Sequence, residues 1–400
     1  MSLQAGRNGT SSAAKILFVA HSAFRGGAEF CLDSLLHGLP QDRYEITVIF
    51  PWEGPMVDSV RAIGSQAVVR PLSWWIYWGF SVRNVKSLLI RTAPNICWLV
   101  SFIRRHRFDL VYSNTAAIFE AAIAARIAGV PHIWHVHEVL ERGNVSASVL
   151  PLPWIKKLIS GLADRVIFES AASRDAYQLD GHQDKYLVVH NCVRFREQLS
   201  AGNGAAARRQ LGISQGDQVV AFIGQFLERK NPLLLVRALA RMPDRSRFRC
   251  LFVGAGPLQD RLVREIERLH LADCCRLLPF QDDITPVLNA LDVLVLPSRQ
   301  ESFGLVIVEA AAFGKPAIAT RSEGPGEIIL DGETGYLVRQ DDEEDLARAL
   351  VDIFSSKSQR VRMGQAAARR ARERFSASEY ARKIGKIIDD TLTVRFGKHE

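Results

Sequence analysis

The sequence lacks the features of membrane-spanning, disulfide-bonded and zinc-binding proteins. No window holds about 18 apolar residues free of charge, because Arg91 interrupts the best candidate, so no transmembrane helix is expected. The six cysteines show no paired metal-ligand spacing, and the adjacent Cys274 and Cys275 do not form a zinc motif. The first dozen residues lack the apolar core of a signal peptide. We therefore expect a cytoplasmic protein with reduced thiols and a short disordered lead over residues 1–14.

Length and composition predict a globular protein of two domains. The chain has 400 residues, of which 48% are hydrophobic and 24% are charged, which excludes a largely disordered chain. Its formal net charge of +8 favours anionic partners. Phosphates, nucleotides, nucleic acid and an anionic membrane surface all fit that charge, and the charge alone does not choose between them.

Strands and helices alternate in two successive series along the chain. Apolar runs at 15–20, 44–50, 109–113, 132–138, 166–169 and 187–190 predict the strands of the first series. Runs at 219–224, 249–253, 276–278 and 291–296 predict those of the second. Two such series indicate an α/β protein with two doubly wound parallel sheets and a cleft between them. The predicted domains are 15–195 and 196–375, followed by a C-terminal helix within 376–400.

The stretch from Pro297 to Glu309 is the strongest candidate for a ligand site. A buried strand precedes it, and a helix over 303–313 follows, with Gly314 as the helix stop. The loop should present free backbone amides at the N-terminus of that helix, where phosphate binds readily. Glu301 lies in the loop, and Glu309 lies about two turns along the helix. A nucleotide diphosphate sugar is long enough to reach both, whereas the simpler alternative is an N-cap and a solvated helix position.

Three features of the first series are further candidates. The first strand is followed by a turn that contains Gly26 and Gly27 and then by a helix. This arrangement lets the backbone approach a phosphate group, although a simple tight turn has the same pattern. Alternation over 132–138 puts His135 and His137 on one face of a strand, near the sheet edge where ligands collect. These histidines can be metal ligands, polar contacts to substrate or satisfied core groups. Asn114, which follows the strand 109–113, is with His135 a candidate for acceptor binding.

Five aromatic side chains are concentrated within residues 71–80. They are Trp74, Trp75, Tyr77, Trp78 and Phe80. The stretch is too short to span a bilayer but can form an interfacial anchor or an apolar wall for the acceptor, with nearby basic residues at anionic head groups. The alternative is a loop folded onto its own domain.

The order of these motifs resembles the retaining glycosyltransferases of group 1, family 4, which have the GT-B fold. The likeness covers nearly the whole C-terminal half and is looser in the N-terminal half. The residues that carry it are Gly26-Gly27 with Glu29, 224–232, 254–257, 292–298, 301–305 with Glu309, 314–316 and 332–335.

The resemblance implies a role for each matching residue. Glu309 would hydrogen-bond the ribose hydroxyls, and Glu301 and His137 would lie near the transferring sugar. Lys230 and the amides after Glu301 would hold the diphosphate. The implied catalytic set is His137, Glu301 and Lys230. The implied donor-binding set is Gly26, Gly27, Gln225, Arg229, Lys230, Gly254, Glu301, Ser302, Phe303, Gly304, Leu305 and Glu309.

Two segments depart from the family pattern. Many relatives have Gly-Arg where this chain has Gly224-Gln225, so one cationic phosphate contact is missing unless Arg229 supplies it. An interdomain turn often written Pro-Asn-Gly-Val-Asp is here 190–194, with Cys192 in place of glycine and Arg194 in place of aspartate.

These observations predict a retaining hexosyltransferase that uses a nucleotide diphosphate sugar, UDP- or GDP-linked, as co-substrate. The acceptor is expected to be a hydroxyl of a glycan or a lipid-linked glycan in cell-surface polysaccharide or glycolipid synthesis. No metal or other cofactor and no nucleic acid is expected to take part, and the inner face of the membrane is a further expected partner. The alternatives are a sugar-nucleotide epimerase and a non-catalytic nucleotide-sugar-binding protein of the same fold.

Overall fold

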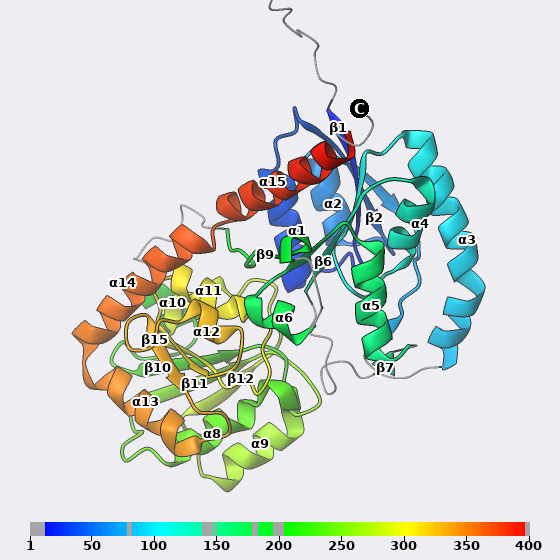
Figure 1. Cartoon of the computed structure of the whole chain (residues 1–400). Coiled ribbons are helices and arrows are strands. Elements are labelled where there is room, and N and C mark those ends of the chain that lie inside the picture. The colour runs from blue at the N-terminus through cyan, green and yellow to red at the C-terminus, as the bar shows by residue number, and fades with distance from the viewer. Residues whose placement is uncertain are drawn as a thin grey trace, which may run out of the picture. The chain divides into compact units, whose positions relative to one another are not determined.

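The fold is described from a computed structural model, which places two parallel sheets with helices around them (Figure 1). The residues that the structure describes are 13–77, 82–137, 147–148, 150–177, 183–194 and 204–396. By contacts the chain divides into two compact units. Unit 1 comprises Met1–His135, Ser148–Val166 and Ile384–Glu400, and unit 2 comprises Val136–Ala147 and Ile167–Lys383.

The first sheet has seven strands in the order β3-β2-β1-β5-β6-β8-β9. Its strands are β1 (Ala14–Val19), β2 (Tyr44–Phe50), β3 (Gln66–Val69), β5 (Leu110–Ser113), β6 (His132–Val136), β8 (Arg165–Phe168) and β9 (Tyr186–Val188). The short β4 (Ile76–Tyr77) and β7 (Ala147–Ser148) form a separate two-stranded sheet. The helices of this half are α1 (Gly27–Gly38), α2 (Pro55–Ala62), α3 (Val82–His106), α4 (Glu120–Ala128), α5 (Leu152–Leu162) and α6 (Ala171–Ala176), with a 3-10 turn, η1 (Gln183–Lys185).

The second sheet has six strands in the order β12-β11-β10-β13-β14-β15, and all its pairs are parallel. Its strands are β10 (Gln218–Ile223), β11 (Phe248–Val253), β12 (Cys275–Leu278), β13 (Val293–Leu296), β14 (Ala317–Thr320) and β15 (Gly335–Val338). Its helices are α7 (Gly204–Gln210), α8 (Pro232–Ala240), α9 (Gln259–Arg268), α10 (Thr285–Ala290), α11 (Leu305–Ala312), α12 (Pro325–Ile328), α13 (Glu343–Ser355) and α14 (Lys357–Arg374), with a 3-10 turn, η2 (Glu228–Lys230).

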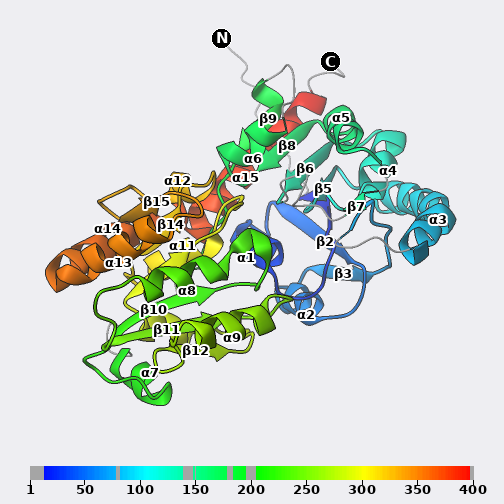
Figure 2. The ribbon, with the colours of Figure 1, turned by 90° about the horizontal axis from the view of Figure 1, so that it is seen from below.

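The second sheet is buried on both faces. Along β10, Val220 and Phe222 belong to one apolar cluster with α8, α9 and α13, while Val219 and Ala221 belong to another with α10, α11 and α14. Figure 2 shows α8 and α9 beside β10, β11 and β12. Because successive side chains of a strand point to opposite faces, an unbroken apolar run is what a strand covered on both faces requires.

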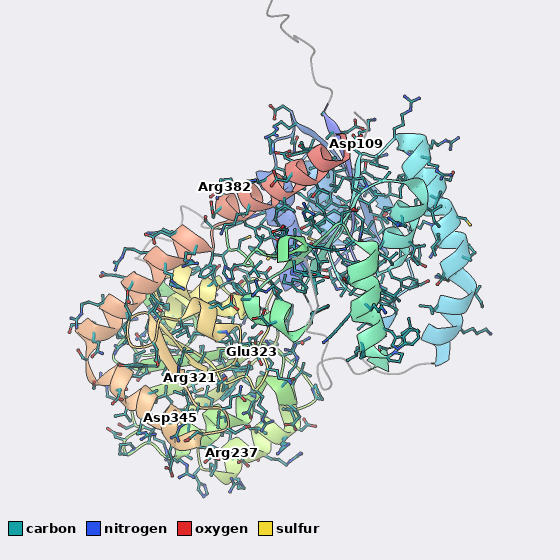
Figure 3. All side chains as sticks on the ribbon, viewed as in Figure 1. Asp109, Arg237, Arg321, Glu323, Asp345 and Arg382 are labelled. Atoms are coloured by element: carbon teal, nitrogen blue, oxygen red, sulfur yellow. The ribbon has the colours of Figure 1, made fainter. Side chains whose placement is uncertain are left out.

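Charged side chains lie on the outer helices of unit 2 and link them. Arg237 of α8 pairs with Glu265 of α9 at 3.1 Å and with Glu343 of α13 at 3.8 Å. Figure 3 labels Arg237 and Asp345 on this outer layer. Such exposed ion pairs contribute little stability, so the two apolar clusters hold the unit together.

The last helix, α15 (Ala377–Phe396), contributes its second half to unit 1. Tyr44 of β2 donates a hydrogen bond of 2.6 Å to Asp389, and Arg43 pairs with the same carboxylate at 2.8 Å. Ile384 and Ile388, both in the part of α15 that belongs to unit 1, are buried. The far end of the chain is therefore part of the core built around the first sheet.

Several element boundaries differ from the sequence predictions. The helix expected over 303–313 begins at Leu305, because Gly304 has a left-handed φ of +95° and serves as its N-cap. Strand β6 ends at Val136, so the expectation that His135 and His137 share a strand face is wrong. The predicted lead and the predicted domain boundary at 195/196 lie largely outside the described residues, and the domain limits stay a prediction.

No helix among the described residues is long and apolar enough to cross a membrane.

Candidate active site

The loops after β10 and β11 meet through their backbones at the carboxyl edge of the second sheet. A Cβ atom built on Gly254 would lie 2.1 Å from the carbonyl oxygen of Gly224, so only glycine fits there. The amide of Phe226 also donates 2.9 Å to the carbonyl oxygen of Ala255. Gln225, between these contacts, is exposed. This edge is where ligands bind in open α/β sheets.

Lys230 is placed by the 3-10 turn η2 and pairs with Glu301. Its ammonium contacts Glu301 Oε2, which also accepts a 3.2 Å hydrogen bond from the hydroxyl of Ser298. Both side chains are mostly buried. A left-handed Asn231, with φ of +50°, ends the turn and donates 2.9 Å to Asp341. The cation is thus held in place by a fixed carboxylate before any ligand arrives.

The loop that carries Glu301 is fixed by the strand and loop beside it. The hydroxyl of Thr320 donates to the carbonyl of Ser298, and the amide of Gly324 donates 3.0 Å to the carbonyl of Glu301. A Cβ atom on Gly324 would lie 2.4 Å from the Cα of Phe303, so the two backbones touch. The loop is therefore held in a defined conformation.

Three successive amides at the start of α11 remain available. Among the described residues, the amides of Ser302, Phe303 and Gly304 have no hydrogen-bond acceptor. They precede an eight-residue helix that begins at Leu305. Unpaired amides and the helix dipole together favour an anion at this position. The sequence prediction placed a phosphate here, and that role stays a prediction.

Glu309 differs from Glu301 in its surroundings. It lies on α11 one turn beyond Leu305, is partly buried, and has no hydrogen-bond partner in the described part of the chain. Burial raises the pKa of this carboxyl to about 7. A desolvated carboxylate without a donor is suited to accept hydrogen bonds from ligand hydroxyl groups.

The nearby arginines have different partners. The side chain of Arg229 is half-buried and has no hydrogen bond or ion pair within the described residues, while its carbonyl accepts from the amide of Arg299 at 2.8 Å. Arg299 itself is neutralised by Asp341 at 2.8 Å and Glu228 at 3.4 Å. Arg229, four residues after Gln225, thus has an uncommitted guanidinium.

His137 follows the end of β6 and lies beside Glu169. Its Nδ1 is 3.8 Å from Glu169 Oε2, and the amide of the Asn191 side chain donates to the same oxygen. Glu169 and Asn191 are each 4% exposed. These three residues belong to unit 2, as do Lys230 and Glu301.

Reasoning from the sequence missed Glu169 and Glu327. Each is an acidic residue in a region of strong burial: Glu169 directly after the apolar strand β8, and Glu327 in α12. His190 donates 2.8 Å to Glu327, whose carboxylate also accepts from the amides of Ala171 and Ala172. Burial alone would raise the pKa of Glu327, but these donors hold it below its ordinary value. A carboxylate at the carboxyl end of a buried strand was the signal available for Glu169.

The remaining candidates lie in unit 1. Gly26 is the N-cap of α1, and Gly27 is its first residue. Asn114 donates 3.2 Å to the carbonyl of Ala28, and His135 Nδ1 lies 2.7 Å from the hydroxyl of Tyr112. Both side chains are fully buried, so neither reaches the surface in this structure. Their role in acceptor binding stays a prediction.

The aromatic stretch is divided between core and surface. Trp75 is buried and stacks on Trp134, with ring centroids 6.0 Å apart. Trp74 is partly exposed and lies against Trp52 at 6.1 Å. Residues 78–80 lie outside the described part of the chain. Trp75 is thus packed into the core of its own unit.

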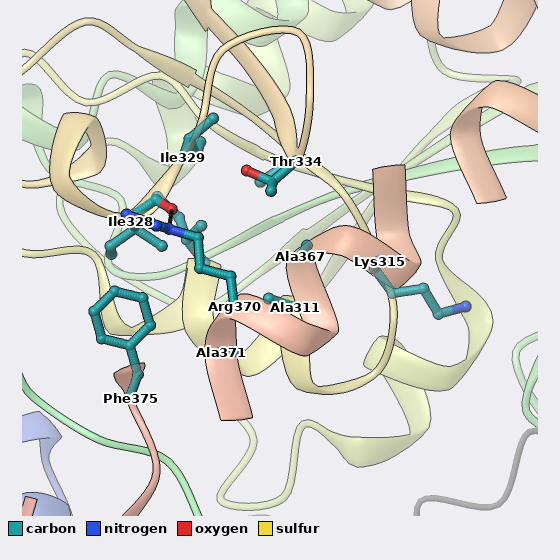
Figure 4. A pocket seen from close by; sticks show the side chains of 11 residues that line it. Ala311, Lys315, Ile328, Ile329, Thr334, Ala367, Arg370, Ala371 and Phe375 are labelled. Carbon is teal, nitrogen blue, oxygen red and sulfur yellow. Dashed lines mark hydrogen bonds between the residues drawn. The ribbon is translucent and has the colours of Figure 1, made fainter. Parts of the chain in front are cut away.

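A small recess is lined by side chains of α11 and α14 (Figure 4), and neither of the two cationic side chains in its lining is available to a ligand. Arg370 lines it and donates 2.8 Å to each of the carbonyls of Glu327 and Ile328. Lys315 donates to the carbonyls of Asn289 and Leu291. Both cations are therefore occupied by backbone, and the rest of the lining is mainly apolar.

Comparison with known proteins identifies the family. The family described as glycosyl transferases group 1 matches residues 205–370, and glycosyltransferase family 4 matches residues 25–196. A D-inositol 3-phosphate glycosyltransferase of Streptomyces scabiei is 33% identical over 368 residues, which cover 86% of this chain and 82% of the relative. The chain belongs to the group 1, family 4 glycosyltransferases.

Other members match less of their own length. A D-inositol 3-phosphate glycosyltransferase of Corynebacterium kroppenstedtii is 32% identical over 67% of this chain and 63% of its own length. An N-acetyl-alpha-D-glucosaminyl L-malate synthase of Bacillus anthracis is 30% identical over 52% of this chain and 54% of its own. In both comparisons the matched residues of this chain cover less than two thirds of the relative's own length.

Solved structures show the same GT-B architecture. HepE of Anabaena, in complex with UDP, has a TM-score of 0.79 at 26% identity, covering 94% of this chain and 100% of HepE. A sucrose-phosphate synthase of Thermosynechococcus elongatus has a TM-score of 0.75 at 18% identity, covering 95% and 100%. The predicted fold class, two Rossmann-like parallel-sheet domains of the GT-B type, is confirmed, whereas the cleft between them stays a prediction.

Proposed function

We propose that this protein is a retaining glycosyltransferase that moves a hexose from a nucleotide diphosphate sugar to a hydroxyl of a glycan or lipid-linked acceptor. The observation that carries the proposal is the arrangement around α11. Three unpaired amides and the Lys230–Glu301 pair lie at one end of the helix, and the unpartnered Glu309 lies further along it. This order matches the order of diphosphate and ribose in a nucleotide sugar.

In this proposal the diphosphate is held without a metal. The amides of Ser302 to Gly304 and the ammonium of Lys230 stabilise the charge that develops on the leaving diphosphate. Because Glu301 already holds Lys230, the cation costs little reorganisation when the bond to the sugar breaks. Arg229 supplies the phosphate contact that Gln225 does not.

Glu309 accepts hydrogen bonds from the ribose hydroxyls. Ionisation of this carboxyl in a poorly solvated position is unfavourable, and the pKa of about 7 reflects that. Two hydroxyl donors stabilise the carboxylate, so the donor and the ionised form of Glu309 favour each other. The structural relative HepE has been solved with UDP and with UDP-glucose. UDP is therefore the first donor nucleotide to test, and GDP is the second.

Retention follows from a front-face substitution. The departing phosphate oxygen takes the proton of the acceptor hydroxyl on the face that it leaves, so no covalent nucleophile is needed. His137 lies near the sugar in this proposal and contacts one of its hydroxyls. Glu301 is tied to Lys230 and Ser298, which suits a positioning role at the sugar end rather than nucleophilic attack.

The acceptor is proposed to be anionic or membrane-linked. The formal net charge of +8 supports this, as does the partly exposed Trp74 beside Trp52. Relatives are named for acceptors that are themselves anionic, inositol 3-phosphate and malate. A cytoplasmic location, with binding to the inner face of the membrane, is part of the same proposal.

A donor panel tests the proposal. UDP-, GDP- and ADP-linked hexoses are each added to the protein, and the thermal midpoint and the products are measured. A shift with one donor, with slow release of an α-configured sugar from an α-linked donor, supports a retaining transferase. Epimerised donor would instead identify a sugar-nucleotide epimerase. Binding without any hydrolysis or transfer to a panel of acceptors would identify a non-catalytic nucleotide-sugar-binding protein.

A further inference from the structure

Glu169 is a buried carboxylate that has no cation of its own. It is 4% exposed, and no lysine or arginine in the described residues pairs with it. The side-chain amide of Asn191 donates to its Oε2. Its Oε1 is buried and accepts no hydrogen bond from the described residues. Burial of a carboxylate with a single neutral hydrogen-bond donor lowers the stability of the fold. This cost indicates that Glu169 has a role other than stabilisation.

The group that Glu169 faces is the imidazole of His137. Oε2, the oxygen that Asn191 holds, lies 3.8 Å from His137 Nδ1. Asn191 therefore fixes the carboxylate on the side of the ring where Nδ1 lies. At 3.8 Å the contact is electrostatic, and contacts of this kind shorten when a substrate fills the site.

The other two histidines of this segment have a different kind of partner. His132 Nε2 lies 2.9 Å from the hydroxyl of Ser113, and His135 Nδ1 lies 2.7 Å from the hydroxyl of Tyr112. A hydroxyl can donate or accept, so it is compatible with either tautomer of the ring. A carboxylate only accepts, so at 3.8 Å its charge favours the tautomer that carries the proton on the nitrogen facing it.

We propose that Glu169, held by Asn191, is a positioning residue that keeps the proton of neutral His137 on Nδ1. The opposite nitrogen, Nε2, then carries a lone pair and accepts a hydrogen bond. With the proposed function, on which this last step rests, its partner is a hydroxyl group of the sugar substrate. Glu169 thereby makes the site selective for a sugar that presents a hydroxyl donor to Nε2.

The tautomer is measured directly by nitrogen NMR. Protein labelled with ¹⁵N in histidine is recorded at a pH where the ring is neutral, and the His137 signals are assigned by their loss in His137→Gln. We expect the proton on Nδ1 in the unsubstituted protein. Glu169→Leu, which removes the acceptor, should shift the population towards Nε2–H, while Glu169→Gln, which keeps an acceptor oxygen, should shift it less.

A matched control distinguishes the effect of Glu169 on His137 from the general effect of removing a buried carboxylate. Glu120 is also buried, accepts 3.1 Å from the side-chain amide of Asn95 and 2.9 Å from the amide of Ser73, and lies in unit 1. Glu120→Gln should leave the His137 spectrum and kcat unchanged, whatever it does to the thermal midpoint. Glu169→Leu should lower kcat about tenfold, the effect of one lost hydrogen bond, with donor KM changed less than about twofold.

The outcomes distinguish this inference from the proposed function. A proton on Nε2 in the unsubstituted protein, or a His137 spectrum that is unchanged in Glu169→Leu, would overturn the inference. A proton on Nδ1 that depends on Glu169 supports it, even if no donor is cleaved. In that case it is the assignment of a transferase that fails, because the NMR measurement needs no substrate.

Discussion

At the scale of single residues, the two glutamates of the α11 region perform opposite tasks. Glu301 is satisfied by Lys230 and Ser298, whereas Glu309 has no donor among the described residues and has a pKa raised to about 7 by burial. Glu301 fixes the position of the Lys230 ammonium. Glu309 can accept hydrogen bonds from the hydroxyl groups of a ligand. Their separate behaviour can be tested by pH and by substitution.

The pH dependence of Glu309 has a definite sign. Its folded-state pKa of about 7 lies above the ordinary value of 4.5, so the folded protein binds more protons than the unfolded chain between these values. The contribution of Glu309 to stability therefore falls as the pH rises through this window. Glu309→Gln should raise the thermal midpoint at about pH 8 relative to the unsubstituted protein, and much less at about pH 5.

Donor affinity should follow the opposite course. Ionised Glu309 accepts from the ribose, so the donor Kd should fall as the pH rises from about 6 to about 8, and Glu309→Gln should flatten this profile. Titration calorimetry in buffers of different ionisation enthalpy measures both the profile and the proton released on binding. A pH profile in Glu309→Gln as steep as in the unsubstituted protein would assign the titration to another group.

The Lys230–Glu301 pair should show strong non-additivity. Lys230→Met leaves Glu301 buried without its cation and should cost about 3–5 kcal/mol of stability, as well as at least about a hundredfold in kcat/KM. The double change Lys230→Met with Glu301→Gln should recover most of the stability but none of the activity. Urea unfolding and donor hydrolysis measure the two effects. Recovery of activity in the double variant would contradict a phosphate role for Lys230.

At the scale of elements, the loop before α11 depends on the glycine that packs on it. In Gly324→Ala the new methyl group would meet the backbone of Phe303, so the loop must move, and the donor Kd should rise about tenfold or more. Gly326→Ala is the matched control, because a Cβ atom there meets no atom within 4 Å. Equal donor affinity in both variants, measured by thermal shift, would show that the loop conformation does not determine binding.

The elements were predicted well where apolar runs are long. Strand β2 has the predicted bounds Tyr44–Phe50, strand β10 differs from its prediction by one residue at each end, and strand β11 differs by one residue at its start. Helix α11 begins two residues later than predicted, since Gly304 adopts a left-handed conformation that periodicity does not reveal. His137 was assigned to a strand that ends one residue earlier, because alternation continues past the last paired residue.

The candidate site was predicted less completely than the fold. Local patterns identified the loop and both glutamates near α11, and the family resemblance pointed to Lys230. The contacts of Glu169 with His137 and of Glu327 with His190 join residues 32 and 137 positions apart, which no local pattern encodes. The burial of Asn114 and His135 is likewise a property of the packed unit rather than of the sequence around each residue.

At the scale of the whole molecule, the net charge of +8 predicts a salt-dependent association with anionic surfaces. The protein should float with vesicles that contain phosphatidylglycerol at low ionic strength, be released by about 0.5 M salt, and ignore neutral vesicles. Trp74→Ala should weaken the association if the partly exposed indole contributes an apolar contact. Flotation that is equal for neutral and anionic vesicles would rule out the electrostatic account.

The central claim is that the start of α11 and Glu309 bind a nucleotide diphosphate sugar. Calorimetric titration of the preferred donor from the panel into the unsubstituted protein and into Glu309→Ala tests it most directly. Loss of the hydrogen bonds to a carboxylate should weaken binding about tenfold to a hundredfold, whereas Glu267→Ala, on the exposed surface of α9, should bind normally. Equal affinity of Glu309→Ala and the unsubstituted protein would contradict the account.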